Sequence, residues 1–193
     1  MKFGSSEKLR VGDWVLAIGN PCGLGGSVSM GIISAKQRDI QSGPYDDYLQ
    51  NDAAINKGNS GGPLFNMDGE VIGVNTAIIS PTGGSIGIGF AVPSDVAMVV
   101  VDQLQRFGET RRGWLGVNIQ SVSEDIAPSL GVEPGRGALV ASVANEGPAD
   151  KAGIKTGDVI VKFDGKTIRS VRALPRIVAQ TAHGTTVEVE IAR

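Results

Sequence analysis

The sequence predicts a mostly β protein built from two modules. Glycine is abundant (28 of 193 residues) and aromatic residues are scarce (5%), and residues 1–92 consist of short apolar runs bounded by glycine, proline or asparagine. This pattern is typical of many strands joined by tight turns. A charged stretch at residues 109–112 separates it from a second alternating region. We therefore expect one module over residues 1–108, a linker over 109–112 and a second module over 113–193.

The first module shows five strand-length apolar runs, at residues 14–18, 28–33, 48–50, 71–76 and 86–92. Asp68-Gly69 predicts a hairpin turn after Leu64-Phe65. Segment 36–47 is polar and contains Gly43-Pro44, so it is expected to be a loop. One helix is expected over residues 95–107, with Ser94 as its N-cap and Gly108 just beyond its last residue.

The second module alternates between short strands and short helices. We expect strands at residues 113–120, 138–143, 159–163 and 186–192, and helical segments at 123–130, 147–152 and 171–181. No internal repeat or low-complexity segment interrupts this order.

Composition excludes several classes of function. The net charge of −2 gives no reason to expect nucleic acid or an anionic membrane as a partner. One cysteine and one histidine are too few for an internal disulfide or a structural zinc site, so we expect no metal and no cofactor. No run approaches the ~20 apolar residues of a membrane span, and residues 1–10 lack the apolar core of a signal peptide.

The most informative stretch surrounds Ser60, in the string Asp52-Ala-Ala-Ile-Asn-Lys-Gly-Asn-Ser-Gly-Gly-Pro-Leu64. A serine hydroxyl becomes a useful nucleophile when a base takes its proton and fixed donors stabilise the oxyanion. The flanking glycines allow the backbone to bend so that two amide N–H groups converge on one point. We expect these two oxyanion donors to be the amides of Gly58 and Ser60.

The spacing Gly58-x-Ser60-x-Gly62 also fits the loose nucleophile pattern of α/β-hydrolases. In those enzymes the serine lies in a strand–turn–helix context. Here Pro63 follows three residues after Ser60 and leads into a strand-and-turn pattern, which argues against the α/β-hydrolase interpretation.

The longer string Gly58-Asn-Ser-Gly-Gly-Pro-Leu64 closely resembles the serine motif of chymotrypsin-fold proteases, and with residues 52–56 it resembles the HtrA/Deg family of serine endoproteases. Residues 9–13, 17–21, 31–34 and 87–93 resemble the same family, so the similarity covers almost the whole chain. It implies the C-terminal six-stranded β-barrel of a chymotrypsin-like (trypsin-like) protease. It also implies cleavage of unfolded or misfolded polypeptides by acyl-enzyme chemistry at Ser60, in the periplasm or cell envelope of a bacterium.

The base that such chemistry needs is not in the expected place. In chymotrypsin-type enzymes the triad runs His, Asp, Ser along the chain, whereas the one histidine here, His183, follows Ser60. His183 stands in a turn of the second module and is interpreted as a solvated turn residue. The resemblance implies that the triad His and Asp lie in a first barrel preceding residue 1, and we expect this chain alone to be inactive. It also implies a trimer-based homo-oligomer for the parent protein.

The resemblance further assigns a substrate pocket and a control loop. The pocket is expected to be uncharged and to accept an aliphatic side chain, lined by Ala54, Ile55, Asn75, Thr76, Ala77, Gly87 and Ile88. Segment 36–47 corresponds to a regulatory loop in which Arg38 is the candidate relay residue.

Two stretches of the second module, residues 113–117 and 147–160, resemble a bacterial PDZ domain, an α+β fold. Such domains add an extended peptide to a sheet edge and hold its C-terminal carboxylate with backbone amides. The expected peptide-binding residues are Trp114, Leu115, Gly116, Val117 and Ile177. Two functions therefore remain open: an HtrA-type endopeptidase, and a truncated pseudoprotease that acts only by binding peptide C-termini.

Overall fold

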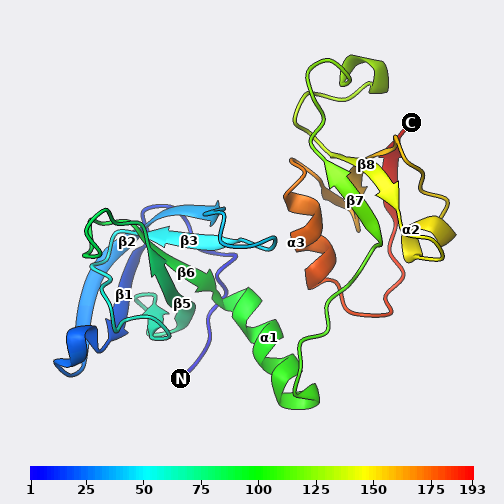
Figure 1. The fold of residues 1–193 in the computed structure, drawn as a ribbon. Helices are drawn as coiled ribbons and strands as arrows, with labels where there is room; N and C mark the ends of the chain where they lie inside the picture. Colours follow the sequence, from blue (N-terminus) through cyan, green and yellow to red (C-terminus); the bar gives the residue numbers. More distant parts are fainter. The chain divides into compact units, whose positions relative to one another are not determined.

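The computed structural model describes residues 1–193, which divide into two compact units, Met1–Thr110 and Arg111–Arg193 (Figure 1). The division falls within the stretch expected as a linker. Each unit has its own buried core.

The first unit is a closed six-stranded barrel. Its strands run in the order β1 (Trp14–Gly19), β2 (Ser27–Arg38), β3 (Tyr48–Asn51), β6 (Gly89–Pro93), β5 (Val71–Ile78) and β4 (Pro63–Phe65), and neighbouring strands are antiparallel. A 3₁₀ turn (η1, Pro21–Gly23) joins β1 to β2. The barrel interior is filled by apolar side chains that include Val15, Ile33, Leu49, Leu64 and Ile72. The predicted barrel is confirmed.

Helix α1 (Ser94–Phe107) follows β6 and ends as predicted, because Gly108 adopts a left-handed conformation and its N–H donates to the carbonyl of Leu104. The prediction that Ser94 caps the helix through its side chain was wrong. Pro93 occupies the N-cap position, and the Ser94 hydroxyl instead bonds the N-terminal segment.

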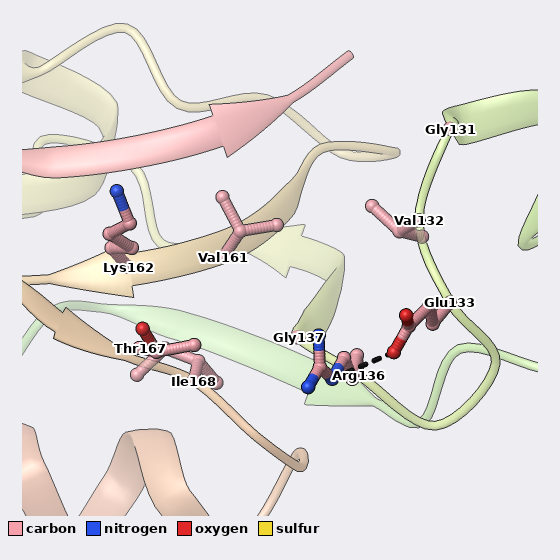
Figure 2. Close-up of a pocket in the computed structure, with 9 residues that line it drawn as sticks. All are labelled: Gly131, Val132, Glu133, Arg136, Gly137, Val161, Lys162, Thr167 and Ile168. Atoms are coloured by element: carbon pink, nitrogen blue, oxygen red, sulfur yellow. Dashed lines mark ion pairs between the residues drawn. The ribbon is translucent and has the colours of Figure 1, made fainter.

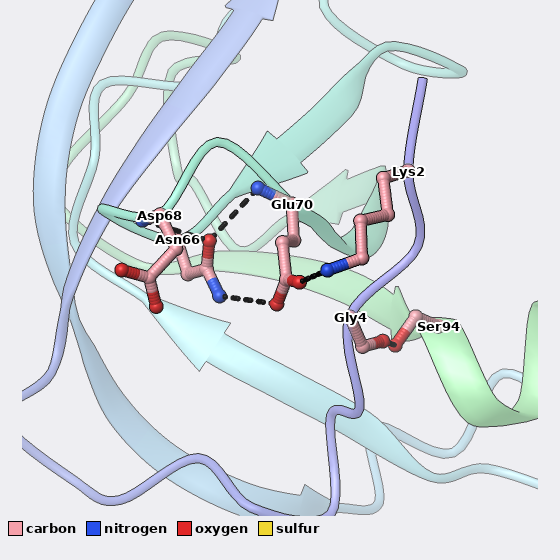
Figure 3. A network of polar contacts seen from close by, with 6 residues as sticks. All are labelled: Lys2, Gly4, Asn66, Asp68, Glu70 and Ser94. Carbon is pink, nitrogen blue, oxygen red and sulfur yellow. Dashed lines mark hydrogen bonds and ion pairs between the residues drawn. The ribbon is translucent and has the colours of Figure 1, made fainter.

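The N-terminal segment lies against the barrel (Figure 3). Phe3 bridges to Val71 at the start of β5, and the ammonium of Lys2 pairs with Glu70 at 2.6 Å. The Lys2 hydrogen bond, together with one from Asn66, lowers the pKa of the Glu70 carboxyl below its ordinary value. These contacts attach residues 2–4 to the β4–β5 hairpin.

The two largest boundary differences in the first unit lie at the end of β2 and at the start of β6. Strand β2 continues to Arg38, so the expected loop over 36–47 begins three residues late, because residues up to Arg38 still pair with β3. The last strand begins at Gly89 rather than residue 86, since Gly87 has a φ of +79° that interrupts extended structure.

The second unit is an antiparallel sheet in the order β10 (Lys166–Thr167), β9 (Val159–Phe163), β8 (Ala138–Val143) and β7 (Val117–Gln120), and β11 (Val189–Ala192) also pairs with β9. Two helices accompany it, α2 (Pro148–Lys151) and α3 (Ala173–Gln180). Leu174, Ile177 and Val178 of α3 pack into the core with Val140 and Ile160. Strand β7 is the last strand at one edge of the sheet.

Five expected elements of the second unit are shorter than predicted. Strand β11 begins at Val189 rather than residue 186, and helices α2 and α3 cover 148–151 and 173–180 rather than 147–152 and 171–181. The strand at 113–120 begins only at Val117, because Gly116 has a φ of +79°. The helix at 123–130 is reduced to a 3₁₀ turn (η2, Pro128–Leu130), since a proline cannot continue an α-helix. No helix in either unit has the length and apolar character that crossing a bilayer requires.

Candidate active site and peptide groove

Ser60 lies in a turn between β3 and β4 and is exposed. Its hydroxyl donates to the backbone carbonyl of Thr76 in β5, at 3.2 Å. No imidazole or carboxylate hydrogen-bonds this hydroxyl. Within the chain, the predicted nucleophile is therefore accessible but has no base beside it.

The turn is held from both sides by backbone hydrogen bonds. On one side, the N–H of Gly61 donates to the carbonyl of Asn75, whose own N–H donates to the carbonyl of Gly62. On the other side, the N–H groups of Asn20 and Cys22 donate to carbonyls of the turn. These bonds fix the turn between β5 and the chain that follows β1.

Glycine is required in this turn because neighbouring backbones come very close. A Cβ added to Gly58 would lie 2.2 Å from the carbonyl oxygen of Asn20, and one added to Gly62 would lie 2.2 Å from that of Ile18. Gly58 also has a φ of +107°, a conformation open mainly to glycine. The glycines noted in the sequence are thus explained by close approach as well as by chain bending.

The amides of the turn fall into two groups. The N–H groups of Asn59, Gly61 and Gly62 donate to the carbonyls of Asn56, Asn75 and Asn59. Those of Gly58 and Ser60 donate to no acceptor in the chain and remain available to an external one. These two amides are the predicted oxyanion donors.

The predicted pocket residues fall on three neighbouring segments. Asn75, Thr76 and Ala77 belong to β5, which pairs with β6, while Gly87 and Ile88 directly precede β6. Ala54 and Ile55 lie between β3 and the Ser60 turn. Ile55 and Asn75 are 2% and 0% exposed. Ile55 belongs to the barrel core, and the side-chain amide of Asn75 donates to the carbonyl of Pro63, so both residues are buried beneath the surface of the turn. Thr76 and Ala54 are exposed.

The burial of three asparagines in this region, one of which is the predicted pocket residue Asn75, was not expected from the sequence. Asn51, Asn59 and Asn75 are buried, and each has at least one side-chain atom without a hydrogen-bond partner in the chain. Buried polar groups are normally paired. The only signal for them in the sequence is an asparagine within an otherwise apolar strand or glycine-rich turn, which does not reveal burial.

Arg38 is the last residue of β2. Its Nε donates to the side-chain oxygen of Gln50 in β3, at 2.9 Å. The loop that follows is organised by Asp46, whose carboxylate accepts from the N–H groups of Ile40 and Ser42 and from the Ser42 hydroxyl. Arg38 is therefore bound to the barrel wall at the start of an ordered loop.

In the second unit, the predicted peptide-binding residues gather at the start of β7. The carbonyls of Leu115 and Gly116 accept from the N–H groups of Ala149 and Ala144, which fixes the turn before the edge strand. Leu115 and Val117 are half-buried against the core that contains Ile177. Trp114 is 65% exposed, and its ring lies 3.2 Å from the place where a Cβ on Gly116 would be.

A separate pocket of about 320 Å³ lies in the second unit (Figure 2). Val132, Val161 and Ile168 form its apolar part. Its charged groups already have partners, because Arg136 pairs with Glu133 at 2.9 Å and Lys162 pairs with Glu190 at 2.9 Å. The pocket therefore presents no unpaired charge that would select a ligand. No group of three or more His, Cys, Asp or Glu side chains is arranged to hold a metal ion.

Comparison with known families agrees with this architecture. A model described as trypsin-like peptidase domain matches residues 1–74, and a model described as PDZ domain matches residues 84–193. The second match begins inside the first compact unit, whereas the structure divides after Thr110. The fold and the site together define a trypsin-like peptidase barrel followed by a PDZ domain.

Individual relatives identify the family within the trypsin-like peptidases. A protein of Brucella suis biovar 1, named "Probable periplasmic serine endoprotease DegP-like", is 60% identical over 94% of this chain and 36% of its own length. A Rhizobium meliloti protein of the same name is 57% identical over the whole chain and 38% of its own length. The chain belongs to the HtrA/DegP-like family of serine proteases. It spans well under half the length of these curated relatives.

This chain also resembles solved structures of HtrA-type proteases. The HtrA-type protease AlgW with tripeptide aligns with a TM-score of 0.84 and 44% identity, over 100% of this chain and 64% of that one. The serine endoprotease from Yersinia pestis aligns with a TM-score of 0.63 and 37% identity, over 100% and 61%.

Proposed function

We propose that this chain carries the nucleophile, the oxyanion donors and the substrate pocket of an HtrA-type serine endopeptidase acting on unfolded polypeptides. The observation that carries the proposal is the Ser60 turn, where an exposed hydroxyl lies beside two amides, those of Gly58 and Ser60, that have no acceptor in the chain. Because neither amide has an acceptor in the chain, both can donate to an oxyanion that forms beside the Ser60 hydroxyl. The periplasm is the proposed location, because the curated relatives are named periplasmic.

In the proposed reaction, the Ser60 oxygen attacks the scissile carbonyl carbon while a base takes the hydroxyl proton. The carbonyl oxygen becomes an oxyanion that accepts hydrogen bonds from the amides of Gly58 and Ser60. The base then returns the proton to the leaving amine, which gives an acyl-enzyme ester that water hydrolyses. Before this, the hydroxyl must leave its hydrogen bond to Thr76.

The pocket proposed to receive the substrate carries no charged side chain. Thr76, Ala77, Gly87 and Ile88 offer small or apolar groups next to the Ser60 turn. A basic substrate side chain would have no partner there, so a small or medium aliphatic residue is the proposed preference at the cleaved bond.

No base reaches Ser60 within residues 1–193, so this chain alone is expected to show no Ser60-dependent cleavage. The test is casein and peptide hydrolysis by the purified chain and by its Ser60→Ala variant. Both should give the same background rate. Rapid hydrolysis that is abolished in Ser60→Ala would overturn the statement that the chain is inactive alone.

A chimera tests the proposed chemistry itself. The chain would replace the matching segment of the Rhizobium meliloti relative, with which it is 57% identical over its whole length. We expect the chimera to cleave unfolded casein and to lose that activity in Ser60→Ala. A chimera that folds and assembles as the relative does, yet cleaves nothing, would exclude the endopeptidase proposal.

The second unit is proposed to bind peptide C-termini along β7, which is free at the sheet edge. In a Trp14→Phe background, Trp114 is the remaining tryptophan and reports directly on this turn. A peptide with a free apolar C-terminus should bind at least about tenfold more tightly than its amidated form, since amide donors hold a carboxylate more strongly than a neutral group. Equal affinities would contradict carboxylate recognition.

A binding-only function is the second candidate. It is favoured by the hydrogen bond from the Ser60 hydroxyl to a carbonyl rather than to a base. An inactive chimera combined with carboxylate-dependent peptide binding would support this candidate over proteolysis.

A further inference from the structure

Segment 79–88, which contributes Gly87 and Ile88 to the proposed pocket, is joined to the Ser60 turn by one side chain. The N–H of Ser85 donates to Oδ1 of Asn56 at 2.9 Å. The rest of the segment is held by its own contacts, such as the N–H of Ile79 bonding the carbonyl of Ile88. Asn56 is thus the hydrogen-bonded link between one pocket wall and the nucleophile turn.

Asn56 is also tied to Asn59, the residue immediately before Ser60. The N–H of Asn56 donates to Oδ1 of Asn59 at 3.2 Å, and the N–H of Asn59 donates to the carbonyl of Asn56 at 3.0 Å. These two bonds close a ring across residues 56–59. Because of this ring, Asn56 and Asn59 are held in a defined position relative to each other.

Asn59 has little freedom of its own. It is 1% exposed, and its Cα lies so close to Gly19 that a Cβ on that glycine would be 2.7 Å away. Its Nδ2 has no partner, so the bond from Asn56 is the one hydrogen bond of the Asn59 side chain. The unpaired Ser60 amide belongs to the peptide plane directly after this residue, and the unpaired Gly58 amide lies one residue before it.

We propose that Asn56 is a positioning residue for the oxyanion donors, transmitting the position of segment 79–88 to the amides of Gly58 and Ser60. The inference rests on the proposed function for the meaning of those amides. The proposal adds that segment 79–88, which forms one wall of the pocket, is coupled to the oxyanion site through the side chains of Asn56 and Asn59. A substrate side chain seated against Gly87 and Ile88 would then stabilise the same backbone that receives the oxyanion.

The first test measures backbone position and needs no catalysis. Amide chemical shifts and hydrogen exchange would be recorded by NMR on the full chain, on Asn56→Ala and on Asn56→Asp, which keeps an acceptor oxygen for Ser85. In Asn56→Ala, exchange at Ser85 should accelerate about fivefold, the worth of one hydrogen bond. In the same variant, the amide chemical shifts of Gly58 and Ser60 should change. Asn56→Asp should leave these two chemical shifts and the Ser85 exchange rate near their wild-type values.

Asn66→Ala is the matched control. Asn66 also bonds backbone N–H groups through its side chain, those of Asp68 and Glu70, but in the β4–β5 hairpin. The Asn66→Ala variant should leave the amide chemical shifts of Gly58 and Ser60 and the exchange rate of Ser85 unchanged. If Asn56→Ala releases Ser85 without shifting Gly58 and Ser60, Asn56 holds only segment 79–88 and the proposal is wrong. If Asn56→Ala unfolds, Asn56→Gln, whose longer side chain moves the acceptor oxygen away from Ser85, takes its place: faster Ser85 exchange with shifted Gly58 and Ser60 resonances supports the proposal, and faster Ser85 exchange with unchanged Gly58 and Ser60 resonances overturns it.

The second test uses the chimera with Asn56→Ala. A misplaced oxyanion site should lower kcat about tenfold or more with little change in KM, since oxyanion donors act mainly in the transition state. A rise in KM with unchanged kcat would assign Asn56 to substrate binding alone and contradict the proposal. An inactive parent chimera would refute the endopeptidase function, whereas the NMR result would still decide whether Asn56 positions the two amides.

Discussion

The hydroxyl of Ser94 donates to the carbonyl of Gly4 at 2.7 Å (Figure 3), and it accepts the N–H of Ser6 at 3.1 Å. Ser94 is the first residue of α1 and is fully buried. The neighbouring Asp95 carboxylate accepts from the Ser6 hydroxyl and from the N–H of Glu7. The start of α1 is therefore where the N-terminal segment is fastened to the barrel.

Ser94→Ala should destabilise the barrel by about 1–3 kcal/mol, because it leaves two buried backbone groups without partners. The measurement is urea unfolding followed by Trp14 fluorescence in a Trp114→Phe background. Ser5→Ala is the control, since the Ser5 hydroxyl makes a longer bond of 3.2 Å to Asp95 in a more exposed place. Its effect should stay within about 0.5 kcal/mol. Equal effects of the two variants would contradict the role given to Ser94.

Gly31→Ala should destabilise the barrel by at least about 1–3 kcal/mol, the usual range for overpacking. A Cβ at Gly31 would lie 2.3 Å from the N of Ala53 and 2.4 Å from the Asp52 carboxylate, in the segment that leads to the Ser60 turn. Gly26→Ala, in the loop just before β2, meets nothing within 4 Å and should be neutral or slightly stabilising. The same fluorescence assay applies. A neutral Gly31→Ala would show that β2 does not approach residues 52–53 as described.

The barrel strands and α1 were predictable because their signals are local. Apolar runs of strand length, turn glycines and the Gly108 helix end each depend on a few adjacent residues. The Ser94 prediction failed for the opposite reason. A serine before a helical pattern usually caps the helix, but here a segment about 90 residues earlier in the chain competes for its hydroxyl.

The candidate site was predictable in its location and less so in its details. The glycines around Ser60 indicate the turn, but the direction of neighbouring side chains depends on barrel closure. Ile55 and Asn75 therefore proved to be interior residues. The Asn56–Ser85 bond joins residues that are distant in sequence and is formed by a backbone donor, so no pattern of residue types could reveal it.

Asp158→Asn should destabilise the second unit by about 1–2 kcal/mol at neutral pH, since hydrogen bonds to charged groups exceed neutral ones. The Asp158 side chain is 2% exposed and accepts from the Arg193 guanidinium at 2.7 and 2.9 Å and from the N–H of Lys155. Unfolding would be followed by Trp114 fluorescence in the Trp14→Phe background. As a control, Glu190→Gln breaks the exposed pair with Lys162 and should cost no more than about 0.5 kcal/mol. If Glu190→Gln lowered the unfolding free energy more than Asp158→Asn, the prediction that the buried Asp158 pair contributes more stability would be refuted.

The stability contributed by Asp158 should also depend on pH. Its pKa is lowered from the ordinary value, chiefly by the hydrogen bond from Arg193 and further by the Lys155 N–H. A carboxyl whose pKa is lower in the folded than in the unfolded state binds fewer protons when folded, so its contribution is complete above the unfolded pKa of about 3.9 and is lost as the pH falls below it. The difference in unfolding free energy between the parent chain and Asp158→Asn should therefore be constant from pH 7 to about 5 and shrink as the pH falls below about 4. Other carboxyls contribute equally to both proteins, so they cancel in this difference. A difference that grows with acidification would show that Asp158 is not held as a charged partner of Arg193.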